Sequence, residues 1–255
     1  MSGRGPAVQV VRRARPLLGT LVEVGLCGAP DEAGLLAACD IAFDAIADVQ
    51  RCLSRFASDS DIARFNSLAA GGWLDVQADT AIVLSAAWQL FNDSDGVFDV
   101  TLGSAPAGWQ LHEHERRLRK LHGGARLDLG GIGKGHAVDR AVQALQCAGL
   151  TSGWVNAGGD LRSFGSAAVE LKLRDEQRGG VVHFGRLNDS AFATSCFGAG
   201  SRSALSAAPR AGTSTHVSVA APLCLVADAL TKVVAASGNT HHPVVARAGA
   251  RAWLH

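Results

Sequence analysis

Apolar and polar side chains alternate near the start of the chain, which is the pattern of a strand with one buried face. Between Leu21 and Leu26 every second side chain is aliphatic, and Glu23 lies between two of them. Basic residues precede this segment and Cys27 follows it, an order that resembles an export signal. Glu23 interrupts the apolar run, however, and Leu26 stands where a small residue should precede cleavage. We therefore predict that residues 17–26 are a strand of the folded domain.

Apolar residues at helical spacing predict three helices outside the central part of the chain. The first helix begins after Pro30, where acidic residues occupy the first turn, and it continues to Leu53. The second helix covers residues 79–91 and the last one covers residues 223–236. The residues expected to point inward from the second helix are Val83, Leu84, Ala87, Trp88 and Phe91.

Polar stretches connect these elements. Residues 54–66 are predicted to form a loop that ends in one short helical turn. Residues 103–124 are polar and basic, and they predict a surface loop with a weak helix. His112 and His114 flank Glu113 in this second stretch, but an isolated pair of histidines on a charged loop is more typical of solvated surface than of a metal site.

A glycine-rich block, LDLGGIGKGHAVD at residues 127–139, is the most informative part of the chain. It predicts a strand over 126–129, a glycine turn, and a helix that reaches Cys147, with Gly149 as its C-cap. Backbone amides at such a turn can approach a phosphate, and both the helix N-terminus and Lys134 add positive charge. The block therefore favours a phosphate site with Lys134 facing an open cleft.

Two familiar phosphate motifs do not fit this block. A Walker A loop requires Ser or Thr where Gly135 stands, and a dinucleotide fingerprint that starts at Gly131 requires glycine where His136 stands. A glycine turn that only packs a strand against a helix is the alternative interpretation.

The last third of the chain predicts mainly strands. A buried strand at 154–157 ends in a glycine turn, strands alternate between 168 and 194, a small-residue loop covers 197–215, and another strand covers 216–221. The chain has neither a short repeat nor a clear linker, so we expect one compact domain over residues 1–255.

Composition narrows the function classes. The net charge is only +1, which gives no electrostatic basis for nucleic acid or an anionic membrane as the main partner. No segment is long enough to span a bilayer. The six cysteines contain no Cys-x-x-Cys pair, so reduced, mostly buried thiols and a cytoplasmic location are expected.

Several segments, taken together, resemble the FAD:protein FMN transferase family, also called the ApbE family. The matching segments are RPLLGT at 15–20, SRF at 54–56 followed by Ser60, Asp61 and Asn66, GVFDVT at 96–101, the block at 127–139, NAGGD at 156–160, ATS at 193–195 and ADAL at 227–230. They follow the family's order and cover most of the chain, so the set is specific although each segment alone is weak.

This resemblance implies an α+β fold, related to the T-fold, with a mostly antiparallel sheet, packed helices and a flavin cleft. It also implies an enzyme that cleaves FAD, attaches FMN to a Thr or Ser hydroxyl of an acceptor flavoprotein, and releases AMP. Magnesium is the family's metal, and a divalent cation would neutralise charge on the leaving phosphate.

The resemblance also implies roles for individual residues. The catalytic residues would be Asp228 and Lys134, and the metal ligands would be the Asp228 side chain and a backbone carbonyl near Gly131. The residues that would bind FAD are Leu18, Phe56, Phe98, Asp99, Asp128, Lys134, Asp160 and Ser195. Each has a structural alternative: Asp128 as a helix cap, Phe98 as core and Asp160 as a turn residue.

The chain departs from the family pattern at three places. In the stretch 205–212, the family's histidine and aspartate are replaced by Leu205 and Ala208. Cys196 replaces the glycine that usually follows the Ala-Thr-Ser segment. Lys232 stands four residues after Asp228, where members usually carry threonine, and residues four apart share a helix face. We therefore expect Lys232 to pair with Asp228 and magnesium to bind weakly or not at all.

These departures leave four functional hypotheses open. The first is an active FMN transferase with a rearranged site. The others are a relative that binds FAD without transferring FMN, a scaffold that only binds a partner protein, and a magnesium-dependent FAD hydrolase that uses water as the acceptor.

Overall fold

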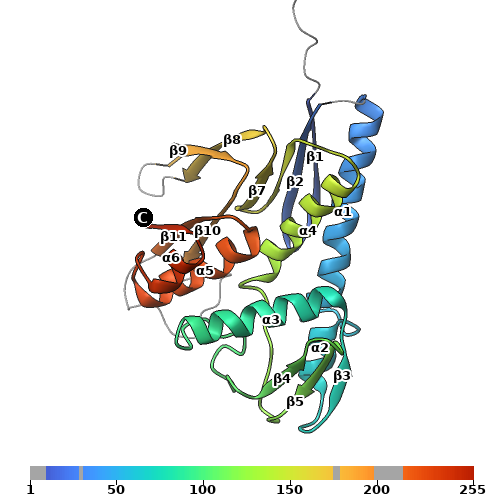
Figure 1. The fold of residues 1–255 in the computed structure, drawn as a ribbon, viewed down its shortest axis with the longest axis vertical. Helices are drawn as coiled ribbons and strands as arrows, with labels where there is room; N and C mark the ends of the chain where they lie inside the picture. Colours follow the sequence, from blue (N-terminus) through green and yellow to red (C-terminus); the bar gives the residue numbers. More distant parts are fainter. Residues whose placement is uncertain (1–9, 29–30, 175–178, 198–214) are drawn as a thin grey trace, which may run out of the picture.

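Seven strands form one antiparallel sheet in the computed structural model, which describes all residues except 1–9, 29–30, 175–178 and 198–214 (Figure 1). In order across the sheet the strands are β1 (Val10–Leu17), β2 (Thr20–Cys27), β6 (Gly153–Ala157), β7 (Asp160–Phe164), β10 (Ala191–Phe197), β11 (Thr215–Ala221) and β12 (Arg251–Leu254). Every neighbouring pair is antiparallel. Tight turns join β1 to β2 and β6 to β7, so these four strands are two hairpins that lie side by side in the sheet.

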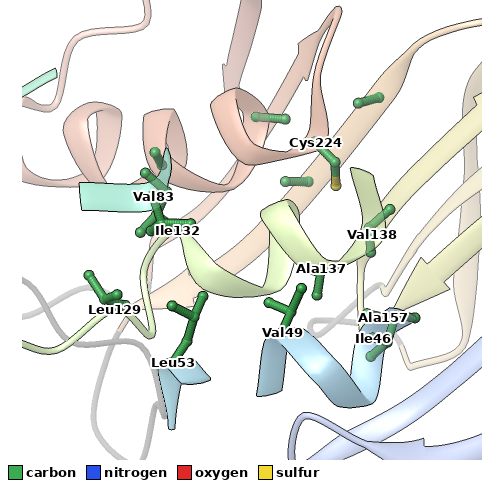
Figure 2. Packing of buried hydrophobic residues seen from close by; sticks show 14 of the residues in the cluster. Ile46, Val49, Leu53, Val83, Leu129, Ile132, Ala137, Val138, Ala157 and Cys224 are labelled. Carbon is green, nitrogen blue, oxygen red and sulfur yellow. The ribbon is translucent and has the colours of Figure 1, made fainter. Parts of the chain in front are cut away.

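Three helices pack on one face of this sheet. They are α1 (Glu32–Leu53), α4 (Gly133–Cys147) and α5 (Cys224–Ser237), and α4 lies between the other two. The apolar residues of α1 recur at helical spacing and are buried against α4, as Val49 shows beside Ala137 (Figure 2). Burial of this stripe is what holds α1 on the sheet, because a helix gains most of its stability from packing.

The hairpin of β8 (Ala168–Arg174) and β9 (Val181–Asn188) lies against other strands of the sheet through a second apolar cluster. Its buried members are Leu161, Leu171, Leu187 and Phe192. Leu161 and Phe192 are cross-strand partners on β7 and β10. Their neighbours Ala191 and Ala193 belong to the main core instead, as the period of two in a strand requires.

A smaller unit lies at one end of the molecule in Figure 1. It contains the antiparallel sheet β3 (Trp73–Asp75), β5 (Arg117–Lys120) and β4 (Trp109–His112), together with α2 (Asp61–Ser67) and α3 (Ala78–Asp93). The short helix α6 (Pro243–Arg247) precedes the last strand. Asp79 on α3 joins this unit to the helical layer, since its carboxylate lies 2.8 Å from Nε2 of His136 on α4.

Most predicted elements are confirmed, including the mixed α+β architecture. The strand predicted at 17–26 is mainly β2, because Leu18 and Gly19 form the turn that precedes it, with φ of 55° and 70°. The long helices begin and end within three residues of their predicted bounds. None of the six cysteines, all of which lie in the described part, forms a disulfide. No described helix is long and apolar enough to cross a membrane.

Three local predictions are wrong. Residues 109–120 contain the β4–β5 hairpin instead of a weak helix; the burial of Trp109 and Leu118 outweighs the charged residues around them. Residues 127–129 are not a strand, because the amides of Leu127 and Asp128 bond to the Asn66 side chain and the Val100 carbonyl.

The third wrong prediction is the inward position of Trp88, whose side chain is 40% exposed on α3. Trp88 stacks with Phe91 and meets the buried Trp109 edge to face. Aromatic contact therefore replaces full burial.

Candidate functional site

The glycine turn leads directly into α4, as the sequence predicts. The carbonyl of Leu129 accepts hydrogen bonds from the amides of Ile132 and Gly133, at 3.1 and 2.7 Å. These bonds turn the chain into the helix, and Lys134 is the second residue of α4. No side chain of its own caps this helix end, so the positive end of the helix dipole lies beside the Lys134 ammonium.

Gly135 is the point at which α4 meets the start of α5. A Cβ atom at this position would lie 2.3 Å from the carbonyl oxygen of Cys224, so only glycine allows the two backbones to approach this closely. The amide of Gly135 donates a hydrogen bond of 3.1 Å to Oδ2 of Asp228. The close approach therefore brings Asp228 on α5 to the N-terminal end of α4.

Two ammonium groups and two carboxylates gather at this helix contact. Lys134 forms an ion pair with Asp160, the first residue of β7, and its Nζ lies 3.8 Å from Oδ2 of Asp228. Lys232 forms an ion pair with Oδ1 of Asp228 one helical turn away. The side chain of Lys134 is about one third exposed, whereas the other three side chains are buried. Lys134 is therefore the member of this charged cluster that a ligand can reach.

The pKa values of the cluster reflect burial and charge together. Burial and the negative charge of Asp228 raise the pKa of Asp160 to about 6. Burial also acts to raise the pKa of Asp228, but Lys134 and Lys232 outweigh it, so that pKa is lowered. Burial acts to lower the pKa of Lys134, but the charges of Asp228 and Asp160 raise it above its ordinary value. Lys134 is thus held as a cation at neutral pH.

Asp160 has one oxygen that the cluster does not use. Its Oδ1 is buried and has no hydrogen-bond partner among the described residues, while Oδ2 pairs with Lys134. A buried acceptor without a partner is costly. This oxygen is consequently an unsatisfied acceptor inside the cluster, next to the ion pair that Oδ2 makes with Lys134.

The residues present do not fit a divalent cation. Both oxygens of Asp228 are engaged, Oδ1 by Lys232 and Oδ2 by the Gly135 amide. The Lys232 side chain also lies against Gly131, where a Cβ would be 3.3 Å from its Cε atom. No group of three His, Cys, Asp or Glu side chains suitable for a metal occurs in the described ranges. The two expected ligands therefore both lie against the Lys232 side chain, Asp228 at its ammonium and Gly131 at its aliphatic part.

Loops from three parts of the chain meet beside the glycine turn. Arg55 forms a 3.2 Å ion pair with Oδ2 of Asp128, and Oδ1 of Asp128 accepts the amide of Gly130 at 2.8 Å. Asp128 therefore holds the turn and does not cap α4. Asp99 is similarly engaged, since its carboxylate accepts the amides of Thr101 and Gly103 at 2.8 and 2.9 Å.

The three apolar site candidates have different surroundings. Phe98 is buried in the main core, whereas Phe56 is 84% exposed and carries the Arg55 guanidinium over its ring. Leu18 is half-buried in the left-handed turn between β1 and β2. That turn precedes Thr20, whose side chain lies where a Cβ on Gly158 would be, so the two hairpin turns are adjacent.

Ser195 lies at the cluster. Its hydroxyl is 3.3 Å from Nζ of Lys232 and 3.0 Å from the hydroxyl of Thr231. The stretch at 205–212, which departs from the family pattern, lies outside the described residues. Cys196, on the next position of β10, lies 3.4 Å from Nε2 of His216.

Two supporting residues had no assigned role in the sequence interpretation. Asp139 on α4 accepts the amides of Cys224 and Leu225 at 3.0 and 2.8 Å and pairs with Arg162, so it caps α5 from a neighbouring helix. Arg55 orients Asp128. Both lie inside segments that match the family, but their partners are too distant in sequence for spacing to identify them.

The antiparallel sheet with its one layer of helices defines an α+β domain. Its charged site is the lysine–aspartate cluster at the N-terminus of α4, where α4 meets α5. The ApbE family model matches residues 18–252, and the chain belongs to the ApbE family.

The fold is also that of solved proteins. It is similar to the flavin transferase ApbE from Vibrio cholerae, with a TM-score of 0.80 and 19% identity over 97% of this chain and 94% of that one. It is also similar to the apo form of the flavinyl transferase ApbE from Pseudomonas stutzeri, with a TM-score of 0.79 and 24% identity over 97% of this chain and 90% of that one. The similarity to the ApbE protein from Thermotoga maritima has a TM-score of 0.80 and 20% identity over 96% of this chain and 94% of that one. No curated protein sequence matches the chain.

Proposed function

We propose that this protein binds FAD and transfers its FMN portion to a Thr or Ser hydroxyl of an acceptor flavoprotein. Membership of the ApbE family supports the reaction class. The observation that carries the proposal within this chain is the position of Lys134, a partly exposed cation at the N-terminal end of α4. Such a position suits the pyrophosphate of FAD. We also propose that residues 1–255 form one domain, that the flavin lies in a cleft beside this cluster, and that the protein acts in the cytoplasm.

In the proposed reaction, the acceptor oxygen attacks the phosphorus that carries riboflavin. A phosphorus–oxygen bond forms, the bond to the AMP phosphate breaks, and AMP leaves with the electron pair of that bond. The hydroxyl proton is lost to solvent or to a basic group. Lys134 would stabilise the negative charge that develops on the phosphate oxygens. Asp228 and Asp160 would act by holding the Lys134 ammonium in place.

The remaining candidates would bind the two ends of FAD. Phe56 is exposed enough to stack on a flavin or adenine ring, and Leu18 offers an apolar edge at the neighbouring turn. Asp128 and Asp99 would act through the loops whose amides they hold. Phe98 would support that loop from the core. Ser195 would contribute through the charged cluster.

A second candidate function is FAD binding without transfer. The observation that favours it is the ion pair between Lys232 and Asp228, which occupies the carboxylate expected to bind magnesium. In this case the FAD site would form as proposed, but the phosphate would lack the electrophilic activation that a metal supplies.

One experiment separates these functions. The purified protein is incubated with FAD and with the flavin-free form of a flavoprotein that carries FMN through a phosphoester bond. Transfer predicts equal amounts of released AMP and of acceptor whose mass has increased by the FMN group. FAD binding with neither product supports the second candidate. Release of AMP and FMN with unmodified acceptor identifies a hydrolase.

The matched variants are Lys134→Ala and Lys134→Arg. Loss of the cation should lower the rate of AMP release by about 100-fold, and arginine should restore part of it. An unchanged rate in Lys134→Ala, with FAD affinity also unchanged, contradicts the proposed role of this residue.

A further inference from the structure

Lys232 is a charged side chain that the fold encloses almost completely, with only 6% of the residue exposed. Its ammonium contacts three oxygen atoms: Oδ1 of Asp228, the backbone carbonyl of Asp228 at 3.0 Å and Oγ of Ser195 at 3.3 Å. The aliphatic part of the side chain runs past Gly131, with a Cβ there 3.3 Å from Cε and 3.5 Å from Cγ. An oxygen cage formed by α5 and β10 is thus filled by a side chain of α5 itself.

The three oxygens are of the kinds that a hard cation prefers: a carboxylate, a carbonyl and a hydroxyl. An ammonium group with three donors satisfies the same oxygens. The spacing of four residues lets the lysine reach the carboxylate on its own helix face. Thr231 completes the arrangement, because its hydroxyl lies 2.7 Å from the Asp228 carbonyl and 3.0 Å from the Ser195 hydroxyl.

Charge balance leads to the same conclusion. Lys134 and Lys232 face Asp160 and Asp228, so two cations meet two carboxylates within the cluster. A divalent cation added to this set would lie against two ammonium groups with no anion left over, and would be repelled. Without Lys232 the set would carry one more negative charge than positive charge, and a cation would be attracted.

We infer that the Lys232 ammonium replaces a divalent cation at this site, and that the protein binds the pyrophosphate of FAD without metal. The part about FAD rests on the proposed function, whereas the part about the cation site does not. Lys134 is then the exposed cation that contacts the phosphates, and Lys232 keeps Asp228 neutralised behind it.

The test uses the full chain and measures metal and FAD separately. Calorimetric titration with MgCl2 and electron paramagnetic resonance with MnCl2 should both show no binding to the unmodified protein below about 1 mM. Titration with FAD should give the same affinity, within about twofold, in EDTA and in about 5 mM magnesium. This magnesium concentration is high enough to fill an ordinary magnesium site.

Two variants separate charge from space. Lys232→Thr removes the charge and opens the cage, and should raise manganese and magnesium affinity by about tenfold or more. Lys232→Met removes the charge but fills the same space, and should gain much less. Thermal unfolding with and without magnesium checks both variants, and only Lys232→Thr should be stabilised by the metal. If Lys232→Thr does not fold, the titrations of the unmodified protein still decide.

Each outcome bears on one claim. The inference is overturned if the unmodified protein binds magnesium and Asp228→Asn loses that binding. It is also overturned if FAD binds only in the presence of magnesium, but in that case the proposed function stands. Absence of FAD binding in both buffers refutes the proposed function, while the metal titrations still test the cation site.

Discussion

The backbone amide of Gly135 on α4 donates a hydrogen bond to the carboxylate of Asp228 on α5, at 3.1 Å. This bond exists because a side chain is missing: a Cβ on Gly135 would overlap the Cys224 carbonyl. The position of the charged cluster therefore depends on the packing of two helices as much as on the charges. Changes in helix packing and changes in charge can be tested independently.

Gly135→Ala should destabilise the protein, because the added methyl group forces α4 and α5 apart. Overpacking of this kind typically lowers the free energy of unfolding by about 1–3 kcal/mol, and backbone atoms cannot move aside as a flexible side chain can. Urea unfolding followed by circular dichroism measures the loss. Gly123→Ala is the control, since a Cβ there has no atom within 4 Å, and equal stability of the two variants would contradict this packing argument.

Asp139→Ala should destabilise α5 in particular. It removes the acceptor for two amides at the start of that helix and leaves Arg162 without its carboxylate. Loss of a helix cap lowers the free energy of unfolding by about 1–2 kcal/mol. Hydrogen exchange should show faster exchange in α5 than in α1. Asp59→Ala, at an exposed position, serves as the control, and uniform exchange in all helices would argue against a local cap.

The contact between Asp79 on α3 and His136 on α4 should make stability depend on acidic pH. The hydrogen bond from His136 lowers the pKa of Asp79 below its ordinary value of 3.8, although burial opposes it. A carboxyl with a lower pKa in the folded state stabilises the fold above the unfolded value and loses that contribution as pH falls through the folded value.

Urea unfolding between pH 6 and pH 2.5, over the range of carboxyl titration, should therefore show a flatter decline for Asp79→Asn than for the unmodified protein. The variant should already be less stable at pH 6. Parallel curves would show that Asp79 has the same pKa in both states and would refute this prediction.

Phe56→Ala should weaken FAD binding without changing stability. The side chain is 84% exposed, so its removal should alter the free energy of unfolding by less than about 0.5 kcal/mol. Loss of an aromatic stacking surface lowers affinity by about tenfold. Quenching of flavin fluorescence gives the affinity, with Trp88→Ala as a control at another exposed aromatic position. Equal affinities of both variants would remove Phe56 from the proposed site.

The sequence predicted those parts of the fold whose signals are local. The apolar stripe of α1, the alternation in β2 and the glycine turn before α4 all formed as expected. The i,i+4 spacing of Asp228 and Lys232 also predicted their ion pair, because both partners lie on one helix face.

Non-local partners decided the remaining features. Residues 127–129 have the composition of a strand, but Asn66 and Val100 provide their hydrogen bonds, so they remain a loop. The β4–β5 hairpin has too few apolar residues for a sequence pattern, and it forms because Trp109 and Leu118 are buried in the tertiary structure. The capping of α5 by Asp139 joins positions 85 residues apart, which no local rule detects.

The buried ammonium of Lys232 has a consequence for how such a site responds to its surroundings. An ion that is covalently part of the chain is present at a fixed effective concentration, so neither chelators nor the supply of metal in the cell can empty its cage. Either lysine codon becomes a threonine codon through a single nucleotide change. One point mutation at this position would therefore change the cation that neutralises Asp228 from a side chain of the protein to a metal ion taken up from solution.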